Sequence, residues 1–178
     1  NATATYDFGF AGLLSSTGYL TRDDAVVQDV TSSLAPFLPL LGVTTPVDSL
    51  SIVTRQSTQI FTQEVRLASK GASAFGWTIG GFYRNSQPSA SGETIVIPDV
   101  IPAGTTLFAS DGSNPSNSKS WAVFGEGSYA ITSELTAIVG LRYFEDRRAQ
   151  ASISTLFNVT AIDTGKAKFH AVSPRFNL

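Results

Sequence analysis

The sequence predicts an all-β fold: an antiparallel up-and-down meander that forms a segment of a transmembrane β-barrel, with short periplasmic turns and long extracellular loops. Three observations predict it. Stretches of roughly ten to thirteen residues with strand character recur along the chain. They are joined alternately by very short turns and by long segments rich in Ser, Thr, Gly, Pro, Asn and Asp. No apolar run is long enough for a membrane-spanning helix. Transmembrane barrels show this alternation, whereas a soluble sandwich has little reason to gather its long loops at one end.

Each element follows from the same pattern, taken in chain order. We expect strands over residues 2–6, 11–22, 58–69, 75–84, 119–130, 135–147 and 166–178. The short turns are expected at 7–10, 70–74 and 131–134, and the long loops at 23–57, 85–118 and 148–165. Sequential pairing of these strands places the turns at one end of the sheet and the loops at the other.

Alternation along the strands separates an apolar face from a mixed one. In the strand at 135–147, Val139 and Leu141 alternate with Gly140 and Arg142. The residues expected to face lipid on this parity are Val65, Leu67, Trp77, Ile79, Val123, Val139, Leu141 and Phe176. A sandwich with its faces reversed gives the same alternation, so the position of the aromatic residues decides between the two folds.

Aromatic residues fall at two levels along the predicted strands, as in the interfacial girdles of a barrel. Tyr83, Trp121, Tyr143 and Phe144 lie toward the long loops, and Phe75, Trp77, Tyr129 and Phe176 lie near the short turns.

Composition argues against several functional classes. A net charge of −2 is unlike that of a nucleic-acid binder. The chain has no cysteine and a single histidine, His170, so it offers no thiolate or multi-histidine metal site and no evident catalytic triad. We therefore expect no enzyme activity, no metal site and no cofactor.

Several segments resemble the barrel strands of TonB-dependent outer-membrane receptors. They are Phe-Thr-Gln-Glu-Val-Arg-Leu-Ala-Ser at 61–69, Trp-Thr-Ile-Gly-Gly-Phe-Tyr at 77–83, the pair at 121–132 and 135–143, and Val-Ser-Pro-Arg-Phe-Asn-Leu at 172–178. The resemblance covers about two thirds of the chain, from Thr58 onward, in the expected order.

The resemblance implies a large plugged barrel in a bacterial outer membrane, whose class has 22 strands. Such receptors import a siderophore, a cobalamin-like compound or an oligosaccharide with energy passed on by TonB. Residues 1–178 are expected to supply about seven strands and to lack the plug domain, the TonB box and the carboxy-terminal strand. The implied partners are the TonB complex through the plug, outer-membrane lipid and the small-molecule or oligosaccharide ligand, with no nucleic acid.

Five charged residues share the parity expected to face the barrel lumen: Glu64, Arg66, Glu126, Arg142 and Arg175. They predict either a polar wall that faces the plug or steers a solute, or a set of cross-strand charge pairs that satisfy one another. The second interpretation is the simpler, because opposite charges on neighbouring strands commonly pair.

The long loops are the expected place of ligand recognition, since a hairpin connection needs only about two to five residues. Phe37, Phe108 and Phe157 are the candidate contact residues there. The apolar segment 33–43 is expected to fold the first loop over the barrel mouth, or to contact a ligand or a partner lipoprotein.

Two other functional classes stay open from the sequence. One is a structural or adhesive β-protein of the outer membrane or cell exterior that transports nothing. The other is a soluble carbohydrate-binding β-sandwich.

Overall fold

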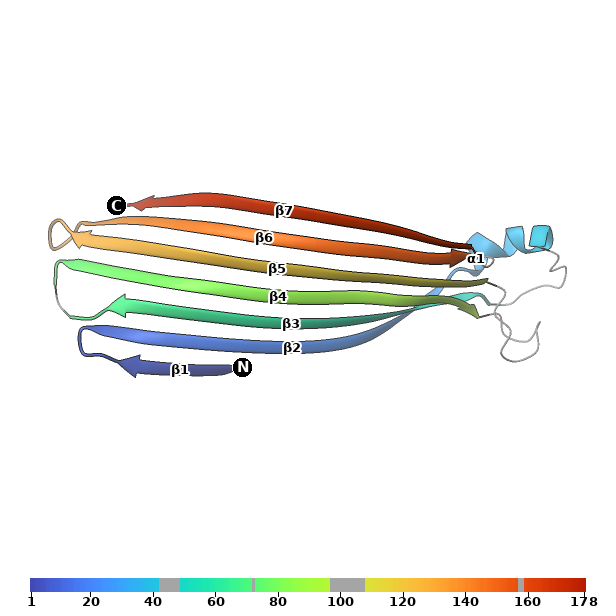
Figure 1. The fold of residues 1–178 in the computed structure, drawn as a ribbon, viewed down its shortest axis with the longest axis horizontal. Coiled ribbons are helices and arrows are strands. Elements are labelled where there is room, and N and C mark those ends of the chain that lie inside the picture. The colour runs from blue at the N-terminus through green and yellow to red at the C-terminus, as the bar shows by residue number, and fades with distance from the viewer. Residues whose placement is uncertain (42–48, 72, 97–107, 157–158) are drawn as a thin grey trace.

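The computed structural model describes residues 1–41, 49–71, 73–96, 108–156 and 159–178. Seven strands form one antiparallel sheet in sequential order, and they run along the long axis of the molecule (Figure 1). Their bounds are β1 Ala2–Asp7, β2 Ala11–Asp29, β3 Ser51–Ser69, β4 Phe75–Val96, β5 Phe108–Ala130, β6 Thr136–Leu156 and β7 Val159–Asn177. This is the predicted meander. The sheet is open, with β1 and β7 at its edges.

The register of the sheet aligns apolar residues with apolar residues. Leu67 of β3 lies opposite Leu13 of β2 and Ile79 of β4, and Val123 of β5 lies opposite Tyr143 of β6. Because side chains alternate between the faces of a sheet, one residue of slip would carry this whole set to the other face. We call the face that bears Val65, Val123 and Val139 the apolar face, and the opposite one the charged face.

The short turns at one end of the sheet have the turn chemistry that the sequence indicates. Gly9 adopts a φ of +85°, which glycine tolerates without a Cβ clash, and its amide donates to Asp7 Oδ1 at 2.8 Å. Lys70, in the next turn, forms an ion pair with the other Asp7 oxygen at 2.6 Å. These contacts tie neighbouring turns together.

The bounds predicted for the three long loops at the other end are wrong, although a long connection does lie between β2 and β3. Strands β2 to β7 continue far into the segments 23–57, 85–118 and 148–165, and β6 and β7 are separated only by residues 157–158. The physical reason is that the ladder is made by backbone groups, which pair equally well when both faces carry Ser, Thr and Asn. Polar composition in these segments marks strands that extend beyond their apolar part, and it does not mark loops.

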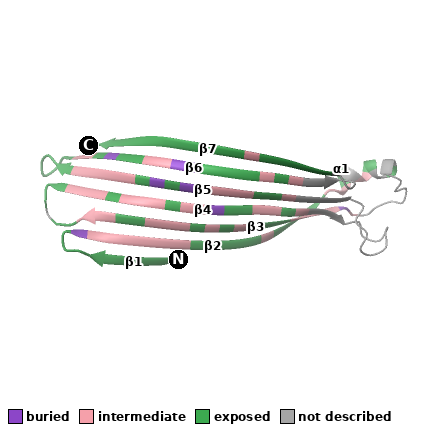
Figure 2. Ribbon diagram, viewed as in Figure 1, coloured by how far each residue is buried: buried purple, intermediate pink, exposed green. Residues whose placement is uncertain are grey.

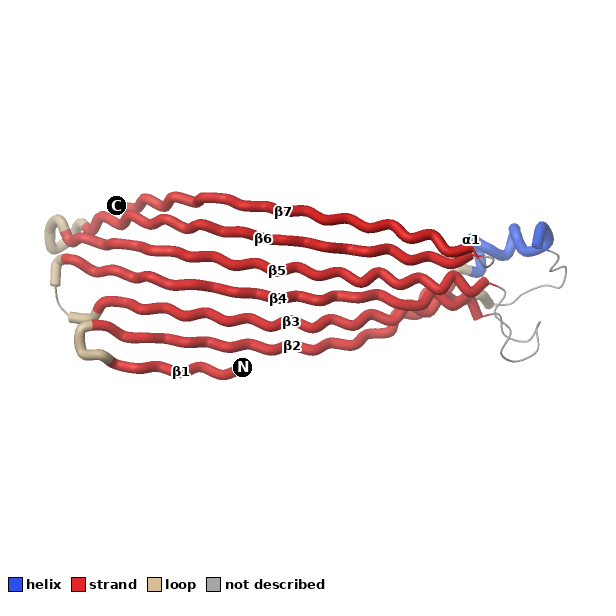
Figure 3. Tube along the Cα trace, in the orientation of Figure 1, coloured by secondary structure: helices blue, strands red, loops and turns tan. Residues whose placement is uncertain are grey.

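A helical segment lies between β2 and β3 at this end of the sheet (Figure 3). A short α-helix, α1 Thr31–Leu34, is followed by the 3₁₀ helix η1 Ala35–Leu41, which contains Pro39. The Asp29 carboxylate accepts hydrogen bonds from the Thr31 amide at 2.8 Å and the Thr31 hydroxyl at 2.6 Å. These bonds hold the pKa of Asp29 below its usual value.

Leu50 connects the two ends of this segment through hydrogen bonds to Thr31 and Val30. Its side chain is fully buried, its amide donates to the Thr31 hydroxyl at 2.8 Å, and its carbonyl accepts from the Val30 amide at 2.9 Å. The residues just after β2 and just before β3 are thereby fixed to each other.

Burial is sparse because the strands form a single layer. Ala11, Leu50 and Ala122 are the buried apolar residues among those the structure describes, and the edge strands β1 and β7 are almost wholly exposed (Figure 2). A sandwich would bury one face of each sheet against a second sheet. The described residues form no second sheet, so this architecture contradicts the soluble-sandwich alternative.

Candidate functional site

The five charged residues named from the sequence lie together on the charged face. Glu64 pairs with Phe82, and Glu126 pairs with Gly140. Arg66 and Arg142 lie in one cross-strand row, which runs from Arg66 through Gly80 and Phe124 to Arg142. All five line one hollow of about 590 Å³, together with Phe82, Phe124, Gly125, Gly140, Leu141, Ser173 and Pro174. Their role toward a lumen stays a prediction.

Two of the arginines in this hollow are paired. Arg66 forms a short ion pair with Glu64 on its own strand, and its guanidinium lies 5.9 Å from the ring centre of Phe124. Arg175 Nη1 lies 3.0 Å from Glu126 Oε2, although β5 and β7 are separated by β6. The pair passes over Gly140, where an added Cβ would lie 3.5 Å from the Glu126 oxygen and 3.6 Å from Arg175 Cβ.

Arg142 is the remaining cation of the hollow. It lies 5.8 Å from the ring centre of Phe144 and forms no ion pair with any residue that the structure describes. With three arginines and two glutamates, the hollow keeps one positive charge in excess. An anionic group is therefore the partner that this arrangement best accommodates.

Gly80 leaves room for Phe124, which lines the same hollow. The Phe124 ring lies directly over it, and an added Cβ would collide with that ring and lie 2.8 Å from the Val65 carbonyl oxygen. The missing side chain leaves space for the Phe124 ring beside the Arg66 guanidinium, which is a packing role for a glycine inside a strand.

The opposite face carries an apolar band, interrupted on β2 and β3 where Gln63 forms hydrogen bonds with Thr17 and Ser15. All eight residues expected to face lipid lie on it, and several are largely exposed: Val65 at 43%, Val123 at 52%, Val139 at 55% and Phe176 at 74%. A soluble monomer rarely leaves so much contiguous apolar surface uncovered. The band is the surface that a membrane would cover.

Aromatic residues border this band at the end away from the short turns. Phe61 contacts Tyr83 with ring centres 6.3 Å apart, and Trp121 contacts Tyr143 at 5.3 Å. We call these four residues the aromatic edge. Phe61 pairs with Asn85, which lies two residues farther from the short turns than Tyr83 does. Trp121 likewise pairs with Glu145, two residues farther from the short turns than Tyr143. The edge therefore shifts toward the short turns from β3 to β6. Strands tilted against a flat membrane surface produce this shift.

The depth of the band fits a bilayer. Trp121 and Tyr129 are eight residues apart on β5, which is about 27 Å along a strand. A tilt of about 40° converts this into about 20 Å of depth, close to the height of the apolar band in outer-membrane barrels. Two aromatic residues do not lie at the predicted levels. Phe144 pairs with Ala122 and lies on the charged face, and Phe176 pairs with Val139 in the middle of the band.

Comparison with known proteins decides the family. The sequence model of the family described as TonB dependent receptor-like, beta-barrel, matches residues 1–178. The chain belongs to the TonB-dependent receptor β-barrels. Its fold is similar to the ferric yersiniabactin uptake receptor of Yersinia pestis, with a TM-score of 0.71 and 13% sequence identity. That similarity covers 97% of this chain and 23% of the receptor, so the chain spans about a quarter of that protein's length. No curated protein matches the chain.

Sequence reasoning missed two acidic residues of this barrel segment. Asp146, only 3% exposed, lies on the charged face and pairs with Arg148 at 2.6 Å and the Ser118 hydroxyl at 2.9 Å. Glu145, 5% exposed, lies on the apolar face just beyond the aromatic edge. Both lie inside the strand predicted at 135–147, so following its two-residue alternation to the last predicted residue would have placed Glu145 on the apolar face and Asp146 on the charged face.

The three phenylalanines proposed as loop contacts lie at different places in the fold, and their contact with a ligand stays a prediction. Phe37 lies in η1 and is 57% exposed, on a connection as expected. Phe108 is the first residue of β5 and so was wrongly placed in a loop. Phe157 lies outside the described residues.

Neither metal chemistry nor a helical anchor is evident in the part of the chain that the structure describes. No group of three His, Cys, Asp or Glu side chains there could hold a metal ion. No helix in the same ranges has the length and apolar character to cross a membrane.

Proposed function

We propose that this chain forms a wall of a receptor in a Gram-negative outer membrane, which takes up a scarce nutrient with energy delivered by TonB. The match of the receptor-barrel family to the whole chain is the observation that carries this proposal. The receptor acts in transport and not in catalysis. Its partners are the TonB complex, reached through a plug domain, and the lipid around the barrel.

Among the candidate solutes, a ferric siderophore fits better than a cobalamin-like compound or an oligosaccharide. The charged face carries an excess positive charge in the hollow around Arg142, which suits an anionic complex. The similar fold of the ferric yersiniabactin receptor supports the same class. Arg142 contacts either the solute on its path or a carboxylate of the plug.

Uptake assays in cells test this function. The receptor that contains this chain is expressed in a strain without its own siderophore receptors, and the cells are given iron-55 siderophores, cobalt-57 cobalamin or labelled maltooligosaccharides. We expect energy-dependent accumulation of one ferric siderophore that disappears when the gene for TonB is deleted. Equal accumulation of every probe with and without TonB would contradict the transport function.

A substitution tests the charged hollow separately. Arg142→Gln should lower siderophore uptake at least about fivefold, the effect of losing one charge-assisted contact of about 1 kcal/mol or more. Arg55→Gln is the matched control, because Arg55 is an exposed cation on the apolar face, outside the hollow. If both variants transport like the wild type, Arg142 has no part in uptake, although the transport function itself would stand.

A further inference from the structure

A second charged feature lies on the apolar face, away from the hollow of the charged face. Lys119 of β5 pairs with Arg147 of β6, which pairs in turn with Lys168 of β7. Lys166 lies two residues before Lys168 on β7, on the same face. We call these four exposed cations the basic cluster. They come from three adjacent strands and line a hollow of about 410 Å³.

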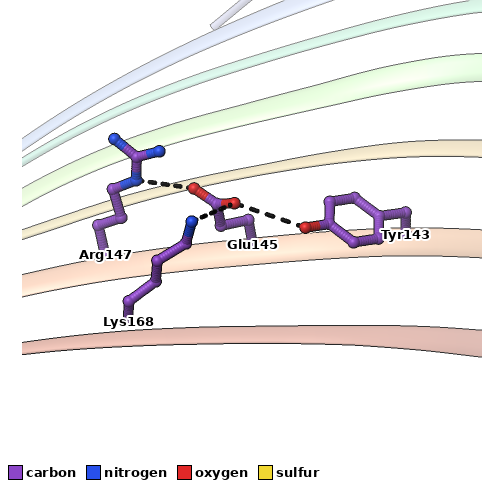
Figure 4. A network of polar contacts seen from close by, with 4 residues as sticks. All are labelled: Tyr143, Glu145, Arg147 and Lys168. Atoms are coloured by element: carbon purple, nitrogen blue, oxygen red, sulfur yellow. Dashed lines mark hydrogen bonds and ion pairs between the residues drawn. The ribbon is translucent and has the colours of Figure 1, made fainter.

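Glu145 is the carboxylate that forms ion pairs with cations of the basic cluster. Glu145 accepts from Arg147 Nε at 2.7 Å, from Lys168 Nζ at 3.1 Å and from the Tyr143 hydroxyl at 3.5 Å (Figure 4). Lys119 and Lys166 have no ion pair or hydrogen bond with the residues that the structure describes. Glu145 therefore holds two cations in place, and the cluster keeps a large positive excess.

The basic cluster lies directly beyond the aromatic edge. Lys119 is two residues from Trp121 on β5, and Glu145 and Arg147 follow Tyr143 on β6. On these strands the apolar face changes from exposed aliphatic to aromatic to cationic within a few residues. That order matches the order of a lipid, with acyl chains below and a charged headgroup above.

We propose that the basic cluster binds the phosphate groups of a glycolipid headgroup in the outer leaflet of the outer membrane. The cations supply the charge that phosphate needs, and the apolar band beneath them supplies the surface for acyl chains. A soluble anion would gain nothing from that band. The inference rests on the proposed membrane placement and goes beyond transport, because it assigns a lipid site to the outside of the barrel.

Lipid binding by the whole receptor tests the proposal. The purified receptor, freed of lipid in detergent, is titrated with bis-phosphorylated lipid A, dephosphorylated lipid A and inorganic phosphate. Lys119→Gln with Lys166→Gln removes the two cations that hold no partner and leaves Glu145 satisfied. Arg22→Gln with Arg55→Gln is the control, since it removes equal charge from β2 and β3 at the same end of the sheet.

We expect the wild type and the control to bind bis-phosphorylated lipid A with the same affinity, and the double lysine variant about 30-fold more weakly, from about 1 kcal/mol for each cation near a lipid surface. Dephosphorylated lipid A should bind weakly and equally to all three. Equal affinity of the lysine variant for the phosphorylated lipid would overturn the proposal. Binding of inorganic phosphate as tight as that of lipid A would overturn it in favour of a free-anion site.

Failure of the lipid site and failure of the proposed function can be told apart. Heat-resistant migration on a gel first establishes that each receptor variant contains a folded barrel. A receptor that inserts into vesicles and transports, yet binds lipid A independently of phosphate, contradicts the lipid site alone. A receptor that fails to insert into vesicles at all contradicts the membrane placement and the lipid site together.

Discussion

Val139 lies at the centre of the apolar band on β6, and its replacement by arginine should destabilise the barrel strongly. The side chain is 55% exposed on the apolar face, four residues from Tyr143 in one direction and four from Leu135 in the other. Four residues correspond to about 14 Å along a strand, or about 10 Å of depth at a tilt of about 40°. Val139 is therefore near the bilayer midplane, where arginine on the lipid face costs about 2–4 kcal/mol.

Reversible unfolding in phospholipid vesicles measures this cost as a change in the free energy of unfolding. Gln87→Arg is the matched control, because Gln87 is exposed on the same face but lies four residues beyond Tyr83, outside the band. The control should cost no more than about 1 kcal/mol. The assignment of the apolar face to lipid would be refuted if Val139→Arg cost as little as the control.

Two further substitutions test the charged face. Gly80→Ala should lower the free energy of unfolding by about 1–3 kcal/mol, because the added Cβ forces Phe124 off its position. Gly81→Ala is the control and should be nearly neutral in the same unfolding assay, since the nearest atom lies 3.8 Å from its added Cβ. Equal effects of the two substitutions would contradict the packing described for Gly80. Asp146→Ala should destabilise the barrel by about 1–3 kcal/mol because a buried carboxylate and its hydrogen bond from Ser118 are lost. Asp146→Asn should recover part of that loss, and an Asn variant as unstable as the Ala variant would count against the hydrogen bond.

The topology was predictable from the sequence because alternation and short turns are local signals. The parity of Val139, Leu141 and Tyr143 indicates one face of a strand, and Gly9 and Gly71 mark the tight turns where φ is positive. Sequential pairing then leaves few topologies to consider. The family resemblance of the middle strands agrees with that reading.

The true length of the strands was not predictable in the same way. In the segment 148–156 β6 carries mainly small or polar residues, with Ile153 and Leu156 as its large apolar ones, so the apolar signal weakens while the backbone ladder continues. The pairing of Glu126 with Arg175 across β6 was equally hidden, because it depends on the small size of Gly140 and on a register that only the folded sheet defines.

The central claim is that one face of this sheet meets lipid and the other does not. The chain has no cysteine, so single cysteines can be placed in turn at residues 121–129 of β5 and labelled with nitroxide in the receptor reconstituted in bilayers. The accessibility of each label to oxygen, which concentrates in lipid, is then compared with its accessibility to a water-soluble nickel complex. The structure predicts strict alternation, with oxygen favoured at Trp121, Val123, Gly125, Gly127 and Tyr129 and not at the positions between them. A profile without a two-residue period, or one with oxygen favoured at the even positions, would contradict this account.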